Sequence, residues 1–306
     1  MKQDFLDDAV KRNRGLISQG VVATYIPELA KVDKNYLGVT IAYADGTILS
    51  SGDTKIRFAI ESISKTVVLA LALLDNGEEE VFKHVHKEPS GDAFNSIKKL
   101  ETEPDHLPRN PFINAGAIMT ASLIKGKDPV DKFNRVLEFM RLISEDKTLE
   151  LGEDIYLSEK KTGDTNRGLA YYMKGQGVLT GEVEDILDVY FKQCSIYVTT
   201  ESLAKIALFF ANGGILSTGE RIIPKKYAQI VNGLIATCGM YDQSGEYLDN
   251  IGIPGKSGVG GGIISPVSSK KLGVAVFGPA LDEQGNSVAG IGIMKDISKE
   301  LDLDMF

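Results

Sequence analysis

A serine and a lysine three residues apart precede an apolar run in the first quarter of the chain. If residues 58–74 form a helix, the side chains of Ser62 and Lys65 lie on one face, about one turn apart. A serine hydroxyl needs a neighbouring base before it can attack a carbonyl carbon, and a lysine becomes such a base when burial lowers its pKa. Because residues 67–74 are apolar and would supply this burial, the sequence predicts a catalytic helix with Ser62 as nucleophile and Lys65 as base.

A second motif, Lys256-Ser257-Gly258, lies far along the chain. Ser-x-x-Lys alone occurs by chance in many helices, but penicillin-recognising enzymes combine it with a Lys-Thr-Gly motif, in which serine can replace threonine as a hydroxyl donor. The glycines that follow Gly258 would let backbone N–H groups approach a ligand oxygen. The sequence contains no Ser-x-Asn or Tyr-x-Asn motif, so we expect another group to replace this third element.

Composition and charge exclude several classes of protein. A chain of 306 residues with 43% hydrophobic residues can bury a sizeable core, as one large domain or two packed lobes. The net charge of −8 and the lack of a basic cluster argue against nucleic-acid binding. The apolar run is too short to cross a bilayer, and the charged N-terminus is unlike a signal peptide. We therefore expect a cytoplasmic protein that binds neither nucleic acid nor membrane.

The histidines and cysteines do not form a metal-binding pattern. His84, His86 and His106 lack His-Glu-x-x-His spacing, and a Ser-His-Asp hydrolase, which would need one of them, is disfavoured. Cys194 and Cys238 form no Cys-x-x-Cys pair, so they are predicted to be buried thiols. The pattern therefore argues against metal catalysis, and we expect no organic cofactor.

The order of elements predicts an α/β (α+β) fold in which the two ends of the chain share one sheet. Asp45-Gly46 between apolar strands indicates a hairpin. We expect strands at 38–43, 47–50, 260–264 and 273–277. We expect helices at 2–19, 129–144, 185–193, 202–212, 224–238 and 288–301. The polar segment 158–167 is predicted to be a solvated loop. The prediction is a single catalytic domain, 1–306, with an α/β lobe from 1–75 and 220–306 and an all-helical lobe from 76–219. Ser62 and Lys256 would meet at the boundary between these lobes.

Eleven separate stretches together resemble the serine-dependent glutaminases, which share the fold of serine β-lactamases. They are residues 25–31, 52–54, 62–65, 87–91, 110–117, 158–159, 163–166, 190–191, 194–196, 238–242 and 256–259. The resemblance covers most of the chain in the family's order. It implies a β-lactamase-like or penicillin-binding-protein-like architecture, with an antiparallel sheet flanked by helices and an all-helical lobe, and a homo-oligomer, either a dimer or a tetramer.

The resemblance also implies a reaction and a set of site residues. The reaction is hydrolysis of the linear side-chain amide of L-glutamine to L-glutamate and ammonia, through an acyl-enzyme on Ser62 with Lys65 as base. The backbone N–H groups of Ser62 and Val259 would form the oxyanion hole. Substrate binding would involve Tyr25, Asn114, Glu159, Asn166, Tyr190 and Tyr241, and the last two tyrosines would also relay protons.

One residue departs from the family pattern: Glu61 stands where the family usually has glutamine. On a regular helix Glu61 would point away from Ser62, but if it faced the site, its charge would raise the pKa of Lys65 and weaken the base. Two alternatives to an efficient glutaminase therefore stay open. They are a penicillin-recognising serine hydrolase and a catalytically weak glutamine-binding protein.

Overall fold

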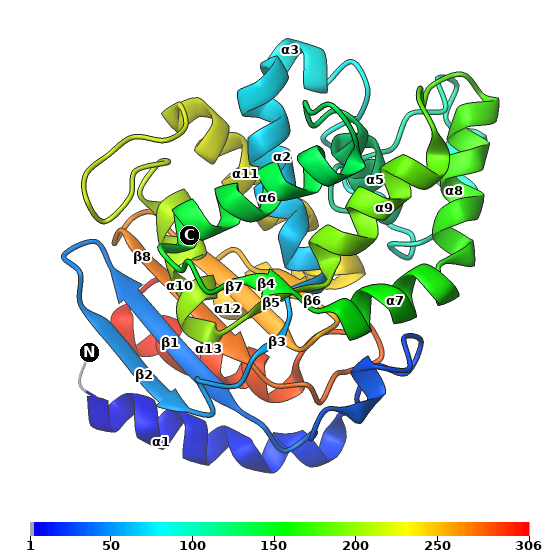
Figure 1. The fold of residues 1–306 in the computed structure, drawn as a ribbon. Coiled ribbons are helices and arrows are strands. Elements are labelled where there is room, and N and C mark those ends of the chain that lie inside the picture. The colour runs from blue at the N-terminus through cyan, green and yellow to red at the C-terminus, as the bar shows by residue number, and fades with distance from the viewer. Residues whose placement is uncertain (1–2, 306) are drawn as a thin grey trace.

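Within residues 3–305, which the computed structural model describes, five antiparallel strands form the main sheet in the order β2–β1–β8–β7–β6 (Figure 1). The strands are β1 (Gly38–Tyr43), β2 (Ile48–Gly52), β6 (Lys256–Gly258), β7 (Gly262–Val267) and β8 (Leu272–Phe277). β1 pairs with β2 in the predicted hairpin and, on its other edge, with β8. The sheet is therefore built from the two ends of the chain, as the sequence predicts.

Helices cover both faces of this sheet (Figure 1). Helices α1 (Gln3–Asn13) and α13 (Val288–Leu301) lie on one face, and α10 (Thr200–Ala211) lies on the other. Thr199 and Ser202 form a reciprocal capping box at the start of α10, which satisfies backbone N–H groups that would otherwise lack partners. All residues of β7 and β8 are buried between the two helical layers, so these strands form a rigid base for the segments that end on them.

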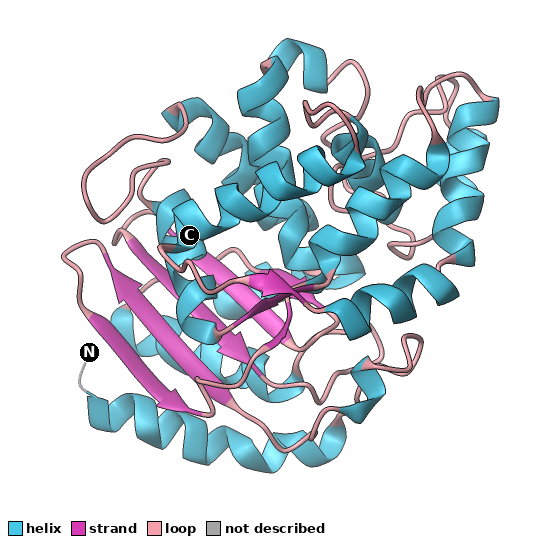
Figure 2. Cartoon of the chain, viewed as in Figure 1, coloured by secondary structure: helices cyan, strands magenta, loops and turns pink. Residues whose placement is uncertain are grey.

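The rest of the chain between the two parts of the sheet is largely helical (Figure 2). The longer helices are α2 (Ser64–Asn76), α5 (Asn114–Ser122), α6 (Pro129–Ser144), α7 (Glu153–Thr162), α8 (Asp164–Gly175), α9 (Val183–Cys194) and α11 (Lys225–Cys238); the shorter ones are α3 (Glu78–Val81), α4 (Lys98–Thr102) and α12 (Ser244–Ile251). α2 is central to this region, since residues 64–73 are all buried.

A small second sheet joins the segment before Ser62 to the helical region. Its strands, in the order β3–β5–β4, are β3 (Phe58–Ala59), β5 (Ile196–Val198) and β4 (Glu150–Leu151). The backbone N–H of Ile60 also donates to the carbonyl of Ile196, at 2.9 Å. The sheet therefore fixes the chain two residues before Ser62.

The predicted combination of an antiparallel sheet, flanking helices and a helical region is confirmed. The solvated loop predicted at 158–167 is wrong, because α7 and α8 cover this segment and separate only at Gly163. A side chain at Gly163 would come within 2.5 Å of the Phe191 ring, so the helices meet closely against α9. The polar residues that suggested a loop occupy helix faces, while Ile155 and Leu169 are buried. The exact lobe boundaries remain a prediction.

Three further observations concern the described part of the chain. Cys194 and Cys238 are buried and free, as predicted. None of the helices found in residues 3–305 is long and apolar enough to cross a membrane. Within the same residues, no group of three or more His, Cys, Asp or Glu side chains is arranged to hold a metal ion.

Candidate active site

Ser62 lies in a short 3₁₀ turn, Glu61–Ile63, immediately before α2. The predicted helix over 58–74 therefore starts later, at Ser64, because β3 occupies its first two residues. Glu61 has a φ of +49°, a left-handed conformation that costs a non-glycine residue free energy and recurs at functional sites. Ser62 is 7% exposed and stands at the N-terminal end of α2, where the helix dipole stabilises negative charge.

Lys65, in the first turn of α2, is fully buried. Its Nζ donates to the backbone oxygen of Phe112 at 3.1 Å and to Oδ1 of Asn114 at 2.8 Å. Burial lowers the pKa of Lys65 to about 8, although Cys194, Glu159 and Glu61 oppose this shift by favouring the charged amine. A neutral lysine amine has two hydrogens and one lone pair. The two acceptors can use both hydrogens, which leaves the lone pair for a proton from a neighbouring hydroxyl.

Asn114 and Asn166 continue the hydrogen bonds made by Lys65. Because Oδ1 of Asn114 accepts from the lysine, its Nδ2 is the atom that donates, at 2.9 Å, to Oδ1 of Asn166. Asn166 must then present its own Nδ2 as a donor. The chain of contacts orients both amides, and it places an N–H donor from α8 at the cavity described next.

A cavity of about 330 Å³ lies in front of Ser62. Six of the sequence-predicted site residues line it: Tyr25, Ser62, Asn114, Glu159, Asn166 and Tyr190. Sequence reasoning missed other lining residues, among them Phe94, Asn95 and Cys194, and it placed Glu61 away from Ser62. Phe94 and Asn95 carry no periodic or chemical signal in the sequence, because they lie in a loop whose path depends on tertiary contacts such as the bond from the Asn114 backbone N–H to the Phe94 carbonyl.

Glu159, on α7, places a buried carboxyl group in this cavity. It is 5% exposed, and its Oε2 has no hydrogen-bond partner among the residues that the structure describes. Burial raises its pKa well above the usual range, and Glu61 raises it further, while Lys65 acts in the opposite direction. Because an unpaired buried carboxylate is costly, this group is suited to bind a cationic group of a ligand.

Tyr241 and Lys256 lie on the other side of Ser62. Tyr241 has a left-handed φ of +57°, and its hydroxyl lies near the Ser62 side chain. Lys256 is fully buried, and its Nζ lies over the Tyr241 ring, 4.9 Å from the ring centre. Burial, and then Lys65, lower the pKa of Lys256 well below its usual range. Lys256 therefore supports Tyr241 from beneath, a position that the Lys-Ser-Gly motif alone does not predict.

Tyr190, on α9, is 2% exposed and lines the cavity beside Cys194. Burial raises its pKa well above the usual range, and a hydrogen bond with Cys194 has the same effect. The hydroxyl therefore stays protonated at neutral pH. Tyr190 and Tyr241 are therefore the candidates to replace the third motif, which the sequence lacks.

Val259 reaches the catalytic segment because glycines flank it. A side chain at Gly258 would come within 2.8 Å of the Ile60 carbonyl oxygen, and one at Gly260 would overlap the carbonyl oxygen of Ala59. This close approach places the backbone of Val259, which follows β6, beside the turn that carries Ser62. Val259 is 6% exposed and does not line the cavity with its side chain, which is consistent with a role for its backbone.

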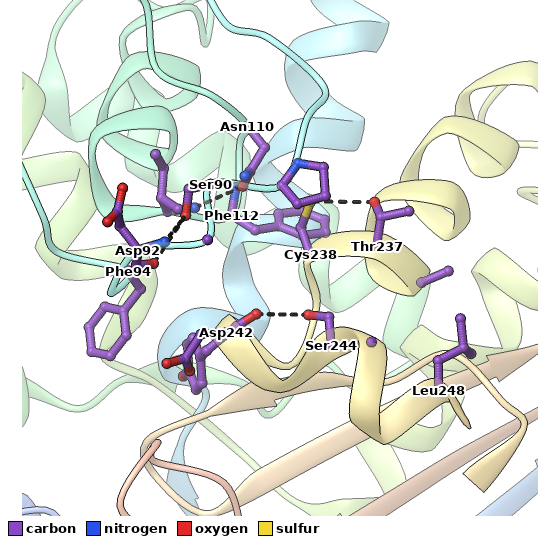
Figure 3. Close-up of a pocket in the computed structure, with 16 residues that line it drawn as sticks. Ser90, Asp92, Phe94, Asn110, Phe112, Thr237, Cys238, Asp242, Ser244 and Leu248 are labelled. Carbon is purple, nitrogen blue, oxygen red and sulfur yellow. Dashed lines mark hydrogen bonds between the residues drawn. The ribbon is translucent and has the colours of Figure 1, made fainter. Parts of the chain in front are cut away.

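A second cavity, of about 390 Å³, is lined by residues that include Phe94, Phe112 and Cys238 (Figure 3). The rings of Phe94 and Tyr241, whose centres are 4.9 Å apart, contribute to its wall. Because the Phe112 carbonyl accepts from Lys65, this second cavity borders the segments that hold Lys65 and Tyr241.

The whole chain resembles one group of proteins in both sequence and structure. A family model described as Glutaminase matches residues 20–306. The chain belongs to the glutaminase family. It is 49% identical over 305 residues to Glutaminase 2 of Clostridium perfringens, with coverage of 99% of this chain and 100% of that protein. It is 51% identical over 304 residues to a glutaminase of Fusobacterium nucleatum, with the same coverage.

Solved glutaminase structures confirm the fold. A Bacillus subtilis glutaminase in covalent complex with 5-oxo-L-norleucine, formed by reaction with 6-diazo-5-oxo-L-norleucine, has a TM-score of 0.89 and 36% identity, with 98% of each chain covered. A probable glutaminase has a TM-score of 0.93 and 35% identity, with coverage of 100% of this chain and 99% of that one. The predicted β-lactamase-like fold is therefore confirmed, and a covalent complex of a family member agrees with a nucleophilic mechanism.

Proposed function

We propose that this member of the glutaminase family hydrolyses the side-chain amide of L-glutamine, giving L-glutamate and ammonia, through an acyl-enzyme on Ser62. Family membership supports the reaction. The observation that carries the residue assignment is a buried lysine of lowered pKa, one turn from Ser62, beside a cavity with an unpartnered carboxylate. That cavity combines a base, a nucleophile and a binding group for an α-ammonium.

In the first half of the reaction, neutral Lys65 removes the proton from Oγ of Ser62. Oγ then bonds to the carboxamide carbon, and the carbonyl oxygen becomes an oxyanion that accepts hydrogen bonds from the backbone N–H groups of Ser62 and Val259. The C–N bond breaks as the leaving nitrogen takes a proton, which comes from Lys65 through the hydroxyl of Tyr241. Ammonia leaves, and the substrate remains as an ester of Ser62.

In the second half, water attacks the ester carbon and gives a proton to Lys65. The C–Oγ bond breaks, Oγ recovers a proton, and L-glutamate is released. Tyr241 is well placed as a relay, since its hydroxyl contacts both Ser62 and, at 3.4 Å, the backbone oxygen of Ser257. Tyr190 stays protonated and acts as a second donor within the cavity.

The α-ammonium and α-carboxylate of the substrate need opposite partners. Glu159 offers a carboxylate for the ammonium group, and Asn166 offers an Nδ2 donor for the carboxylate. Asn114 fixes the orientation of Asn166, and Tyr25, which also lines the cavity, closes the site. Both ends of an amino acid are therefore recognised while its side-chain amide faces Ser62.

The decisive experiment measures ammonia release from L-glutamine by the purified protein, with L-asparagine as a shorter control substrate. The same protein is then treated with 6-diazo-5-oxo-L-norleucine, and the modified peptide is identified by mass spectrometry. We expect release from L-glutamine, little from L-asparagine, and modification of the peptide that contains Ser62.

Other results would favour the alternatives. Labelling of Ser62 by penicillin without ammonia release would indicate a penicillin-recognising hydrolase. Tight glutamine binding by folded protein without release, also in the presence of phosphate, would indicate a binding protein. The cytoplasmic location that the sequence predicts and the dimer or tetramer that the family resemblance implies remain part of the proposal, and the oligomer is tested by sedimentation.

Replacing Glu159 by glutamine should weaken substrate binding. The change keeps the size of the side chain but removes the charge that faces the α-ammonium, and losing one partner of a buried charge pair costs about 2 kcal/mol or more, which corresponds to about 30-fold in KM. Steady-state kinetics with L-glutamine measure this change. Glu153→Gln, which removes an exposed carboxylate from the same helix, is the control, and an equal KM effect in both variants would contradict the role of Glu159.

Replacing Gly260 by alanine should lower kcat more than it changes KM. The new methyl group would overlap the Ala59 carbonyl oxygen, so the Val259 N–H must move away from Ser62, and loss of one oxyanion donor typically costs about 10²-fold or more in kcat. The control is Gly233→Ala, because a side chain at Gly233, in α11, meets no atom within 4 Å. Unchanged kcat in a folded Gly260→Ala protein would show that Val259 does not stabilise the oxyanion.

A further inference from the structure

Glu61 faces the catalytic cavity, contrary to the expectation from regular helix geometry. It is 2% exposed and lines the same cavity as Ser62 and Glu159. Its left-handed φ of +49° turns the chain out of helical geometry one residue before Ser62, which explains why the side chain does not follow the helix. Gly258 packs against this turn, since a side chain there would lie 2.8 Å from the Ile60 carbonyl oxygen and 3.4 Å from Cβ of Glu61.

The Glu61 carboxyl group lacks a full set of partners. Its Oε1 is buried and has no hydrogen-bond partner within residues 3–305, and the corresponding observation holds for Oε2 of Glu159. The Tyr25 side chain lies near the Glu61 carboxyl and lowers its pKa, opposing the effect of burial. Two buried carboxyl groups thus border one cavity, each with an oxygen that needs a donor. A ligand that carries several N–H donors and a positive charge would satisfy both.

The other charged and titratable groups around Glu61 come from several elements. They are Tyr25 before the sheet, Lys65 on α2, Glu159 on α7, Tyr190 and Cys194 on α9, and Tyr241 after α11. Lys65 is the cation among these six groups, and the Phe112 carbonyl and Asn114 already accept from it. If Glu61 and Glu159 were both ionised, their two negative charges would exceed the single positive charge of Lys65. A cationic ligand would restore the balance.

Resting on the proposed glutaminase activity, we propose that Glu61 and Glu159 form a two-carboxylate subsite that binds the α-ammonium group of the substrate. An ammonium group has three N–H donors, enough for the free oxygen of each carboxylate and one further acceptor. Glu61 is thus a specificity residue for substrates that carry a free α-amino group. The second carboxyl should disfavour amides that lack this group, since they bring no positive charge that would let the two buried carboxyls ionise and hydrogen-bond to the ligand.

Glu61 also affects the base. Burial raises the pKa of Glu61 to about 8, with Lys65 and Tyr25 opposing the shift, and the charge of Glu61 in turn favours protonated Lys65. Binding of the α-ammonium keeps Glu61 ionised. The negative charge of Glu61, which improves recognition of the ammonium group, therefore also raises the pKa of Lys65. Lys65 then becomes neutral, and able to act as a base, only at a higher pH.

The test compares L-glutamine with glutaramate, which has the same terminal amide and carboxylate but no α-amino group. In Glu61→Gln, we expect KM for L-glutamine to rise by about tenfold or more, because the amide keeps the shape but not the charge. KM for glutaramate should stay the same or fall. The acid limb of kcat for L-glutamine should move to lower pH, since Lys65 loses a neighbouring negative charge. Glu61→Asp keeps the charge and should retain most of the discrimination.

Binding measurements separate this inference from the proposed reaction. Calorimetric titration of Ser62→Ala and of Ser62→Ala/Glu61→Gln with L-glutamine needs no turnover, so a loss of affinity in the double variant would support the subsite even if the wild type released no ammonia. In Ser62→Ala itself, affinity for L-glutamine should rise with pH between about 6 and 9, while affinity for glutaramate falls. Equal effects on both ligands, or no effect of Glu61→Gln in folded protein, would overturn the proposal.

Discussion

Ser62→Ala should abolish ammonia release while the protein keeps its fold and still binds L-glutamine. Removing the nucleophile of an acyl-enzyme mechanism typically lowers kcat by about 10⁴-fold or more, because no other group can form the covalent intermediate. The loss should be large since Ser62 joins three parts of the site: the turn before α2, the Tyr241 hydroxyl and the cavity. Ammonia release and calorimetric binding, measured on the same preparation, test both expectations.

Ser122→Ala is a matched control for this variant. Ser122 ends α5, where its hydroxyl bonds only to Met119 among the described residues, so its loss should leave kcat nearly unchanged. Substantial ammonia release by folded Ser62→Ala would mean that another group, such as a water activated by Lys65, attacks the amide. The acyl-enzyme mechanism would then be wrong.

Lys65→Met should have the second-largest effect on kcat. Methionine fills most of the buried volume of lysine but cannot accept a proton, and loss of a general base typically costs about 10² to 10⁴-fold. In the wild type the base acts in its neutral form, so kcat should rise with pH up to about 8, the pKa to which burial lowers Lys65. Below that pH the rate should fall about tenfold for each unit, because protonated Lys65 has no lone pair.

A pH profile of kcat from pH 5 to 10 tests this assignment. The wild type should show the acid limb, and the small residual activity of Lys65→Met should lack it. Unfolding by denaturant gives the necessary control, because methionine leaves Asn114 Oδ1 and the Phe112 carbonyl without their donor. An unchanged acid limb in Lys65→Met would assign the titration to another group in the cavity.

Local patterns in the sequence predict much of the fold. Asp45-Gly46 fixes the β1–β2 hairpin because these residues readily take the backbone angles of a tight turn. The apolar spacing of α6 and the glycines after α10 and α11 place these helices within a few residues of their observed ends. These predictions succeed because they depend on neighbours in the sequence.

The parts of the site that the sequence does not predict depend on contacts between distant segments. The orientation of Glu61 depends on its own left-handed backbone conformation, next to the closely packed Gly258 and Gly260 from a distant part of the chain. The polar segment at 158–167 forms helices because α7 and α8 bury their apolar residues against α9. Likewise, the position of Lys256 beneath Tyr241 follows from β6 meeting the turn at Ser62. The spacing of Ser62 and Lys65 predicts these two residues, whereas the family resemblance implies the other site residues.

The strand order of the main sheet has a consequence for synthesis of the protein. A ribosome makes Ser62 and Lys65 early, but β1 gains its second partner, β8, only when the last quarter of the chain has emerged. The segment with Val259, which carries the proposed oxyanion donor, is made equally late. For most of its synthesis, the growing chain therefore contains Ser62 but lacks β8 and the Val259 segment, which complete the proposed site. Hydrolysis begins only when the two ends of the chain have met.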